Sequence, residues 1–170
     1  MPLRDIITYP DPRLRDVATP VTAFDETLLA LATDMAETML SVGGIGISAC
    51  HIGVLQRVVA LALPGATGGR VFVNPVITWS DTEIGRNEEG SVSMPDVTEE
   101  VDRPVRIRFS YRDLRGNERS EEADGLFSIC MQHEIDQLDG IFWLNRLSRL
   151  KRERAVRRFE KIQRAKAKVA

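Results

Sequence analysis

The sequence has no long run of apolar residues and very few cysteines, and each shortage excludes a class of protein. No stretch approaches the ~20 apolar residues that a membrane-spanning helix needs, so we expect no membrane span. The first residues, MPLRDIITYPDPRLRD, are charged from Arg4 onward and lack the hydrophobic core of a secretory signal, so we expect a protein that is not secreted. The two cysteines, Cys50 and Cys130, are 80 positions apart. We therefore expect free thiols in a reducing, cytoplasmic compartment rather than a disulfide.

The remaining composition is that of an ordinary globular protein. The chain has 170 residues, of which 43% are hydrophobic and 28% are charged, and this balance excludes general disorder. The sequence shows no internal repeat, no low-complexity linker and no second domain. We therefore expect residues 1–170 to form a single domain, since one domain is what this length predicts.

Charge is distributed unevenly along the chain, although the formal net charge is only -2. Residues 146–168 contain eleven Lys or Arg and two acids, a net of +9, so the rest of the chain carries -11. A basic tail on an acidic body favours a tail that meets an anionic partner, such as RNA or a membrane surface. The alternative is a solvated helix whose basic side chains complement the acids of the body.

Hydrophobic periodicity indicates which segments are helices and which are strands. Helices are predicted over about 28–39 with Asp25 as the N-cap, over about 125–138, and over the basic tail at about 148–168. Strands are predicted at about 55–63, 70–78 and 105–112. One buried central helix among several strands predicts an α+β fold.

Two stretches are unusual in composition but suggest no chemistry when each is taken alone. Residues 43–53, GGIGISACHIG, are rich in glycine but lack the strand–GxxxxGK[ST]–helix context of a phosphate loop. They therefore do not predict nucleotide binding. Residues 88–96, EEGSVSMPD, are predicted to be an acidic loop of small residues.

A third stretch, MQHEIDQLDG at residues 131–140, lies on the second predicted helix. It contains His133-Glu134-x-x-Gln137, which is one residue short of the His-Glu-x-x-His helix of zinc hydrolases. Residues at i and i+4 share a helix face, so two imidazoles there can bind one metal while the Glu handles the proton of a bound water. Here Gln137 occupies the second ligand position, so this stretch taken alone favours a hydrogen-bonded core histidine over a metal ligand at His133.

In order and spacing, the three stretches together resemble the motifs of peptide deformylase, the family that removes the formyl group from nascent N-formylmethionyl chains. The family pattern is G-hydrophobic-G-hydrophobic-A-A-x-Q, then E-G-C-hydrophobic-S, then Q-H-E-x-D-H. The matching segments are residues 44–51, 89–93 and 132–137. The resemblance covers essentially the whole chain, from TYPDPRLR to DGIFWLNRLSRLKR. It implies a peptide deformylase fold, with strands around a central motif helix and a C-terminal helix.

The resemblance also implies roles for individual residues. A divalent metal, typically iron, nickel or zinc, is bound in the family at the positions that are here Ser91, His133 and Gln137. Glu134 would shuttle the proton, and the oxyanion donors would be the His51 side chain and the Val92 backbone N–H. The substrate pocket, including the site of the methionine side chain, would be lined by Gly44, Ile45, Gly46, Leu126, Ile129 and Cys130.

The chain departs from the family pattern at two of the three ligands and at the oxyanion glutamine. A serine hydroxyl keeps its proton, whereas metal binding needs a deprotonated donor. A glutamine amide is neutral and hard, and suits calcium better than zinc or iron. The loss of two ligands costs on the order of 6–8 kcal/mol, or about 10⁴–10⁶ in affinity. We therefore expect no metal at full occupancy, and a protein that is impaired or inactive as a deformylase.

Three hypotheses about function remain open. The chain could be a binding relative of the enzyme that holds formylated nascent peptides or docks on the ribosome, with no role for DNA. It could instead be an active hydrolase with iron, nickel or zinc in a rebuilt site, where His51 joins His133, Glu134 or Cys130. The third is acyl transfer by Ser91 with His133 or His51 as the base, which has suitable residue types. No nucleophile-elbow sequence supports that third hypothesis.

The basic tail belongs to the first of these hypotheses. In active relatives the basic C-terminal helix can dock on the ribosome near the exit of the nascent chain. The bases expected to contact RNA phosphates are Arg149, Lys151, Arg152, Arg154, Arg157 and Arg158.

Overall fold

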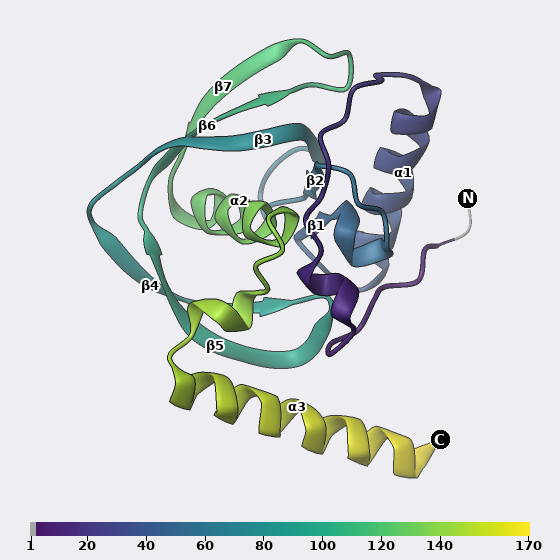
Figure 1. The fold of residues 1–170 in the computed structure, drawn as a ribbon, viewed down its shortest axis with the longest axis vertical. Helices are drawn as coiled ribbons and strands as arrows, with labels where there is room; N and C mark the ends of the chain where they lie inside the picture. Colours follow the sequence, from purple (N-terminus) through teal and green to yellow (C-terminus); the bar gives the residue numbers. More distant parts are fainter. Residues whose placement is uncertain (1–2) are drawn as a thin grey trace.

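A computed structural model gives the fold of residues 3–170, while residues 1 and 2 of the expected domain lie outside the described residues. The helices are α1 (Glu26–Ser41), α2 (Gly125–Leu138) and α3 (Arg149–Val169). Short 3-10 turns occur at Pro12–Arg15, Ala49–Ile52 and Trp143–Arg146. In Figure 1, α2 lies in the centre with strands above and below it, and α3 runs along the bottom of the molecule. None of the helices in residues 3–170 has the length and hydrophobicity that crossing a bilayer requires.

The strands of the described residues form two antiparallel sheets. The larger has the order β1-β2-β3-β6-β7, and its strands are Gly46–Ser48, Val58–Leu61, Arg70–Ser80, Ile107–Arg112 and Glu118–Ala123. The smaller is a long hairpin of β4 (Ile84–Ser91) and β5 (Met94–Pro104). Its register pairs Ser91 with Met94, so a short turn at Val92 and Ser93 closes the hairpin. This mixture of antiparallel sheets and separate helices is an α+β fold, which confirms the predicted class.

The central helix α2 is buried on nearly every side. Ten of its 14 residues are buried, including every residue from 130 to 138. One face packs through Met131, Ile135 and Leu138 against Phe72 and Phe109 of the larger sheet. Its remaining buried residues include polar and charged side chains, which need partners inside the protein. These side chains belong to the motif discussed below.

Gly140 fixes the end of α2. It has a φ of +75°, and a Cβ atom there would lie 2.5 Å from the Arg15 carbonyl oxygen. Only glycine therefore allows the chain to leave the helix so close to the N-terminal segment. The Leu138 carbonyl accepts a bond from the Ala18 backbone N–H at 2.8 Å, which ties the same two segments together.

A second apolar cluster attaches α3 to the hairpin. Val97 and Val101 of β5 pack there with Trp143 and with Phe159 of α3. Along β5, the residues at 97, 99, 101 and 103 are buried and alternate with more exposed neighbours. Two of these inward positions are charged, Glu99 and Arg103. This strand therefore lacks the apolar alternation by which strands are recognised in a sequence.

The predicted elements agree with the structure where the apolar periodicity is strong. Asp25 caps α1 as predicted, and its carboxylate accepts bonds from the N–H groups of Thr27 and Leu28. The strand predicted at 55–63 is limited to Val58–Leu61, and the one predicted at 70–78 continues to Ser80. The interpretation of residues 88–96 as a loop is wrong, because they end β4, turn, and begin β5. The strands β1 and β7 have no counterpart in the prediction, since β1 has three residues and β7 is mostly polar.

Candidate functional site

A pocket of about 610 Å³ lies where the three motif stretches meet. Its walls are formed by residues 42–46, 88–92, 94–98 and parts of α2, with Ile6 and Thr8 from the N-terminal segment. The sequence-predicted residues that line it are Gly44, Ile45, Gly46, Ser91, Val92, Leu126, Ile129, Cys130, His133 and Glu134. His51 and Gln137 are buried but are not among the lining residues. The fold thus brings ten of the twelve predicted site residues to one pocket.

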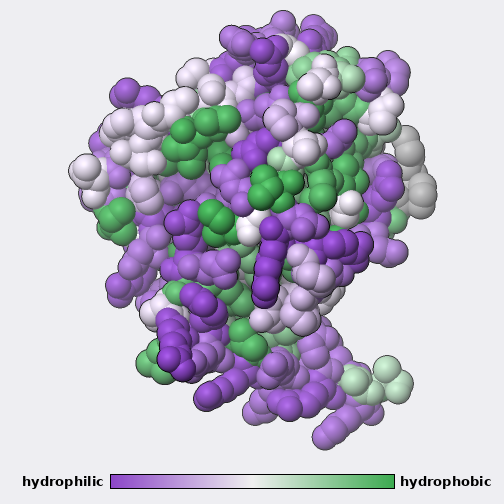
Figure 2. Space-filling model, in the orientation of Figure 1, coloured by the Kyte–Doolittle hydropathy of each residue, from purple (hydrophilic) through white to green (hydrophobic). Residues whose placement is uncertain are grey.

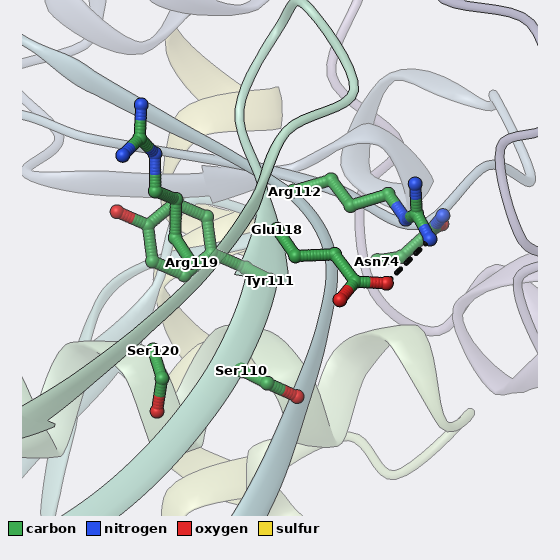
Figure 3. Close-up of a pocket in the computed structure, with 7 residues that line it drawn as sticks. All are labelled: Asn74, Ser110, Tyr111, Arg112, Glu118, Arg119 and Ser120. Carbon is green, nitrogen blue, oxygen red and sulfur yellow. Dashed lines mark hydrogen bonds and ion pairs between the residues drawn. The ribbon is translucent and has the colours of Figure 1, made fainter.

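Another hollow, of about 440 Å³, lies on the β6–β7 hairpin (Figure 3). An ion pair of 2.8 Å joins Arg112 to Glu118 across it, drawn as a dashed line. Arg119, which also lines it, pairs with Asp113. Each charged side chain of this hollow therefore already has an ion-pair partner, and none of the three motif stretches contributes to it. The pocket beside α2 is the candidate site.

A buried chain of charges holds His133 in place. His133 Nδ1 lies 2.9 Å from Glu89 Oε1 on β4, and Arg103 of β5 donates two bonds to the same carboxylate, at 2.6 and 2.9 Å. Arg103 also donates to Asp136 of α2 at 2.8 Å, and Arg146 donates to Asp136 from the other side. Arg103 is only 3% exposed. The chain His133–Glu89–Arg103–Asp136–Arg146 therefore joins both strands of the hairpin to the motif helix.

The ion pairs that link His133, Glu89 and Arg103 shift the pKa of both members of the His133–Glu89 pair. Burial acts to lower the pKa of His133, but the bond to Glu89 and the charges of Glu134 and Glu89 outweigh it, so the pKa is raised. Burial acts to raise the pKa of Glu89, but the bonds from His133 and Arg103 outweigh it and the pKa is lowered. Both shifts favour the charged forms. The pairing with Glu89 thus favours the cationic form of the imidazole ring.

Glu134 is a buried carboxyl group in the pocket wall, and one of its oxygen atoms lacks a hydrogen-bond partner among the described residues. It is 4% exposed, and the oxygen atom without a described partner is Oε2. Burial raises the pKa of Glu134 to about 7, against the charge of His133 and the Ser48 hydroxyl, which both act to lower it. The glycine-rich strand lies directly against it, because a Cβ at Gly46 would be 3.0 Å from Glu134 Oε1. An unpartnered buried carboxylate oxygen carries a free-energy cost that a bound donor would remove.

His51 lies beside Glu134 but does not bond to it. Its Nδ1 is 3.7 Å from Glu134 Oε2, which is too long for a hydrogen bond. The same nitrogen accepts a bond from the Ser48 backbone N–H at 3.1 Å and is 2.9 Å from Ser48 Oγ. Burial and the charge of His133 lower the pKa of His51 to about 3, so the ring is neutral. With Nδ1 as the acceptor, the proton is on Nε2, which is buried without a described partner.

The two substituted ligand positions have structural partners of their own. Gln137 is 1% exposed, and its Nε2 donates to the Leu14 carbonyl at 2.7 Å. Ser91 Oγ accepts a bond from the Ser93 backbone N–H at 3.1 Å, within the turn between β4 and β5. No hydrogen bond within residues 3–170 joins Ser91 to either histidine, so the geometry lacks the contact that a serine nucleophile and its base require.

The donor set does not fit the divalent metal that the family binds. Across the described part of the chain, no group of three or more His, Cys, Asp or Glu could hold a metal ion. The rebuilt combination of His51, His133, Glu134 and Cys130 therefore forms no such group either. Burial, with the charge of Glu134, raises the pKa of Cys50 to about 11 and that of Cys130 to about 12. Both are free, buried cysteines whose thiols keep their protons, whereas a thiolate is what a metal needs.

The network around His133 was not predicted from the sequence. Arg103 and Glu89 are separated by 14 residues and meet only because β4 and β5 pair. Asp136 offered a signal, since a carboxylate within an otherwise buried helix requires a cationic partner. The sequence does not say which arginine supplies that partner.

Comparisons with known proteins agree on one family. The family model described as polypeptide deformylase matches residues 3–153. A protein named "Peptide deformylase-like" from Brucella melitensis is 58% identical over 164 residues, covering 96% of this chain and all of the relative. One named "Peptide deformylase" from Maricaulis maris is 43% identical over 169 residues, covering 98% of this chain and 97% of the relative. The crystal structure of a peptide deformylase from Legionella pneumophila superimposes with a TM-score of 0.92 at 36% identity, covering 98% of both chains.

Replacing Gln137 with Leu tests whether this residue is structural. The change keeps most of the volume but leaves the buried Leu14 carbonyl without its donor. We expect the free energy of unfolding, measured by urea denaturation, to fall by about 1–3 kcal/mol. The matched variant Gln137→His retains a ring N–H that can donate to this carbonyl and should lose less than half as much. Equal losses in the two variants would contradict a structural role for this hydrogen bond.

The His133–Glu89 pair predicts a specific dependence of stability on pH. A group whose pKa is raised by folding stabilises the protein fully below its unfolded pKa, and this stabilisation is lost as the pH rises through the folded pKa. For Glu89, whose pKa is lowered, the stabilisation is present above the unfolded value and is lost as the pH falls. The stability difference between the unmodified protein and Glu89→Gln should therefore be largest between pH 4.5 and 6.5, the ordinary values of the two groups.

We expect this difference to reach about 3–5 kcal/mol, because the variant leaves Arg103 and His133 without their buried carboxylate. It should shrink as the pH rises above 6.5. The exposed Asp102→Asn serves as the control, and its effect should not vary over the same range. A Glu89→Gln effect that grows toward alkaline pH would contradict the raised pKa of His133.

Proposed function

The chain belongs to the peptide deformylase family, and we propose that it has kept the family's binding pocket without the metal-dependent hydrolysis. In this proposal the whole chain is one cytoplasmic domain that binds the N-terminus of a nascent peptide. The observation that carries the proposal is the state of the two substituted ligand positions. Ser91 and Gln137 offer neutral oxygen or nitrogen atoms and form bonds within the protein.

The loss of the ligands removes the source of a reactive nucleophile. A free water molecule has a pKa of about 15.7, against about 7 when a zinc ion binds it. A carboxylate such as Glu134 then has no activated water from which to take a proton. Since the donor set does not fit a divalent metal, we propose no hydrolytic step for this site.

The binding function needs only the groups that remain in the pocket. Leu126, Ile129 and Cys130 supply an apolar wall that suits an unbranched side chain such as methionine. Gly44 and Gly46 allow the backbone of the opposite wall to approach closely: a Cβ at Gly44 would lie 3.0 Å from a Val92 methyl carbon. In the proposal, the peptide N-terminus enters between these walls and its first side chain packs on the apolar one.

Metal content and activity test the proposal directly. The purified protein should contain far less than one metal per chain by mass spectrometry. It should also show no deformylation of an N-formylmethionyl peptide above background after nickel, iron or zinc is added. Near-stoichiometric metal with turnover would contradict the proposal and favour a rebuilt site.

A second experiment restores the two substituted metal ligands and tests for a gain of metal binding. Ser91→Cys combined with Gln137→His replaces both substituted donors, and should raise the affinity for nickel or zinc by about 10⁴–10⁶. The variant Ser93→Cys combined with Gln137→His adds the same residue types but places the thiol at a position that does not line the pocket. It should show a much smaller gain than the restored variant.

We also propose an anionic partner for α3, and the pairing of its bases limits where contact can occur. Several of the bases expected to touch RNA are ion-paired with the protein itself. Lys151 pairs with Glu100, and Arg154 and Arg158 pair with Glu99. Arg149 pairs with Glu153 within the helix, and Arg152 donates to backbone carbonyls. Lys151, Arg154 and Arg158 thus complement acids of the body, as the alternative interpretation of the tail expected.

One face of α3 carries basic side chains that form no ion pair with the described residues. Arg157, Lys161, Arg164 and Lys168 follow one another at intervals of four, three and four residues, which places them in one stripe. All four are exposed, and none forms an ion pair or hydrogen bond with another described residue. The region where α3 lies is mostly hydrophilic in Figure 2. We propose this stripe as the contact for ribosomal RNA phosphates, in which only Arg157 belongs to the set expected from the sequence.

Ribosome binding by the stripe should depend on salt in proportion to its charge. Cosedimentation with ribosomes between 50 and 200 mM salt should give a linear fall of log affinity against log salt. The double variant Arg157→Gln, Arg164→Gln should reduce that slope by about 1.5. The control Arg15→Gln, Arg115→Gln makes the same change at two other exposed arginines, and should leave the slope unchanged. A flat salt response of the unmodified protein would contradict the proposed contact.

A further inference from the structure

We propose that α3 couples its RNA contact to the peptide pocket, so that RNA bound along the helix weakens the binding of a peptide in the pocket. The inference concerns the regulation of this site, and it rests on the proposed function because it needs both a peptide and RNA as ligands. It follows from the contacts that α3 makes with the back of one pocket wall.

The residues of β5 at positions 96–98 line the pocket and also contact α3. Lys166 of α3 forms an ion pair of 2.9 Å with Asp96. Val97 packs in the apolar cluster that contains Phe159 of α3. The C-terminal helix, which runs beneath β5 in Figure 1, therefore holds this wall of the pocket from behind.

Arg158 makes the third of these contacts, and it links the wall to a buried carboxylate. Its Nη2 donates to the Thr98 carbonyl at 2.5 Å and lies 3.5 Å from Glu99 Oε2. Arg154, one turn earlier on α3, donates two bonds to the same oxygen of Glu99, at 3.1 and 2.7 Å. Glu99 is 8% exposed, so its charge depends on these two arginines. Arg154 and Arg158 therefore hold the backbone at positions 98 and 99 against α3.

The pocket side of the same wall is closely packed. The Thr98 hydroxyl donates to Glu88, which also lines the pocket. Within the hairpin, a Cβ at Gly90 would lie 2.9 Å from the Val97 carbonyl oxygen. Asp96 has a φ of +67°, a conformation that a residue other than glycine retains only where surrounding contacts hold it. Because the wall is bonded on both sides, a shift at α3 reaches residues that face a bound peptide.

Arg154 and Arg158 also border the stripe proposed as the RNA contact. Arg157 of the stripe lies three residues after Arg154. Lys161 of the stripe lies three residues after Arg158, and residues three apart are neighbours on a helix surface. The side chains of Arg154 and Arg158 are 55% and 47% exposed, although their partner Glu99 is buried. A phosphate on the stripe can therefore offer either arginine a charge-assisted bond.

These two uses of the arginines compete. A phosphate that takes a bond from Arg158 removes a donor from the Thr98 carbonyl, and one that binds Arg154 weakens the pairing of Glu99. The wall then loses part of its support, and the affinity for a peptide falls. Linkage requires that a bound peptide lowers the affinity for RNA by the same factor. We expect a factor of about five, at the low end for coupled sites, because the apolar contacts of Phe159 stay in place.

Peptide affinity measured on the full chain with and without RNA tests the inference. The peptide is formyl-Met-Ala-Ser with a C-terminal amide, which carries no charge that RNA could attract or repel. The RNA is a short duplex, added at a constant salt concentration of about 50 mM. By isothermal titration calorimetry, the dissociation constant of the peptide should rise about fivefold as RNA is added and then reach a plateau. A dissociation constant that rises without limit would mean that the two ligands exclude each other from one site, and would overturn the inference.

The variant Arg158→Gln removes the contact for which the wall and the RNA compete. Without RNA it should weaken peptide binding by about fivefold, and added RNA should then change the affinity by less than about twofold. Arg149→Gln is the matched control, because it removes the same charge from the same helix at a side chain that pairs with Glu153 of α3 itself. It should bind the peptide as the unmodified protein does and retain the effect of RNA. Circular dichroism and urea denaturation check that each variant is folded.

The outcomes separate this inference from the proposed function. If the unmodified protein binds both ligands and RNA leaves the peptide affinity unchanged or raises it, the inference is overturned and both binding functions stand. A full effect of RNA in folded Arg158→Gln would also overturn it. If the folded, unmodified protein binds no peptide or no RNA, the proposed function itself fails, and the inference with it. The measurement on the unmodified protein needs no variant, so the inference stays testable if Arg158→Gln does not fold.

Discussion

The architecture depends on one buried ionic chain, because a helix buried on nearly all sides cannot leave its polar groups unpaired. Arg103 bridges Glu89 of β4 and Asp136 of α2, and is 3% exposed. Removing any one member would leave a buried charge without its partner. The free-energy cost of that loss is far larger than the net contribution of the intact ion pairs to stability. The chain of ion pairs joins both strands of the hairpin to α2. It fixes how the β4–β5 hairpin lies on the motif helix, and so where His133 and the pocket walls stand.

The same constraint explains how the site can change its chemistry without losing its structure. The position of Gln137 has a structural requirement, a donor for the Leu14 carbonyl, and an amide meets it as well as an imidazole would. The position of Ser91 lies within the turn between β4 and β5, and its hydroxyl accepts the Ser93 backbone N–H. Metal ligation makes a different demand, for deprotonated donors. The two demands are separable, so the fold and the pocket persist where the ligand set does not.

The sequence predicted those parts of the molecule whose signals are local or repeated. Asp25 and the apolar residues that follow it at helical spacing predicted α1. The three motif stretches predicted most of the pocket wall. It did not predict β4 and β5, because the inward positions of β5 include Glu99 and Arg103 and the strand shows no apolar alternation. Nor could it predict that Lys151, Arg154 and Arg158 are paired while Arg157 is free. That distinction depends on which face of α3 lies on β5, which is a property of the packing between them.

Residues of β5 form ion pairs with α3, with β4 and with α2. Near one end Asp96 lines the pocket and pairs with Lys166, in the middle Glu99 pairs with Arg154 and Arg158, and near the other end Arg103 anchors the ionic chain. The acids of β5 thus neutralise the inner face of α3, which leaves its outer stripe as unmatched positive charge. The strand β5 therefore determines both which bases of α3 remain unpaired and, through Arg103, how the hairpin lies on the motif helix.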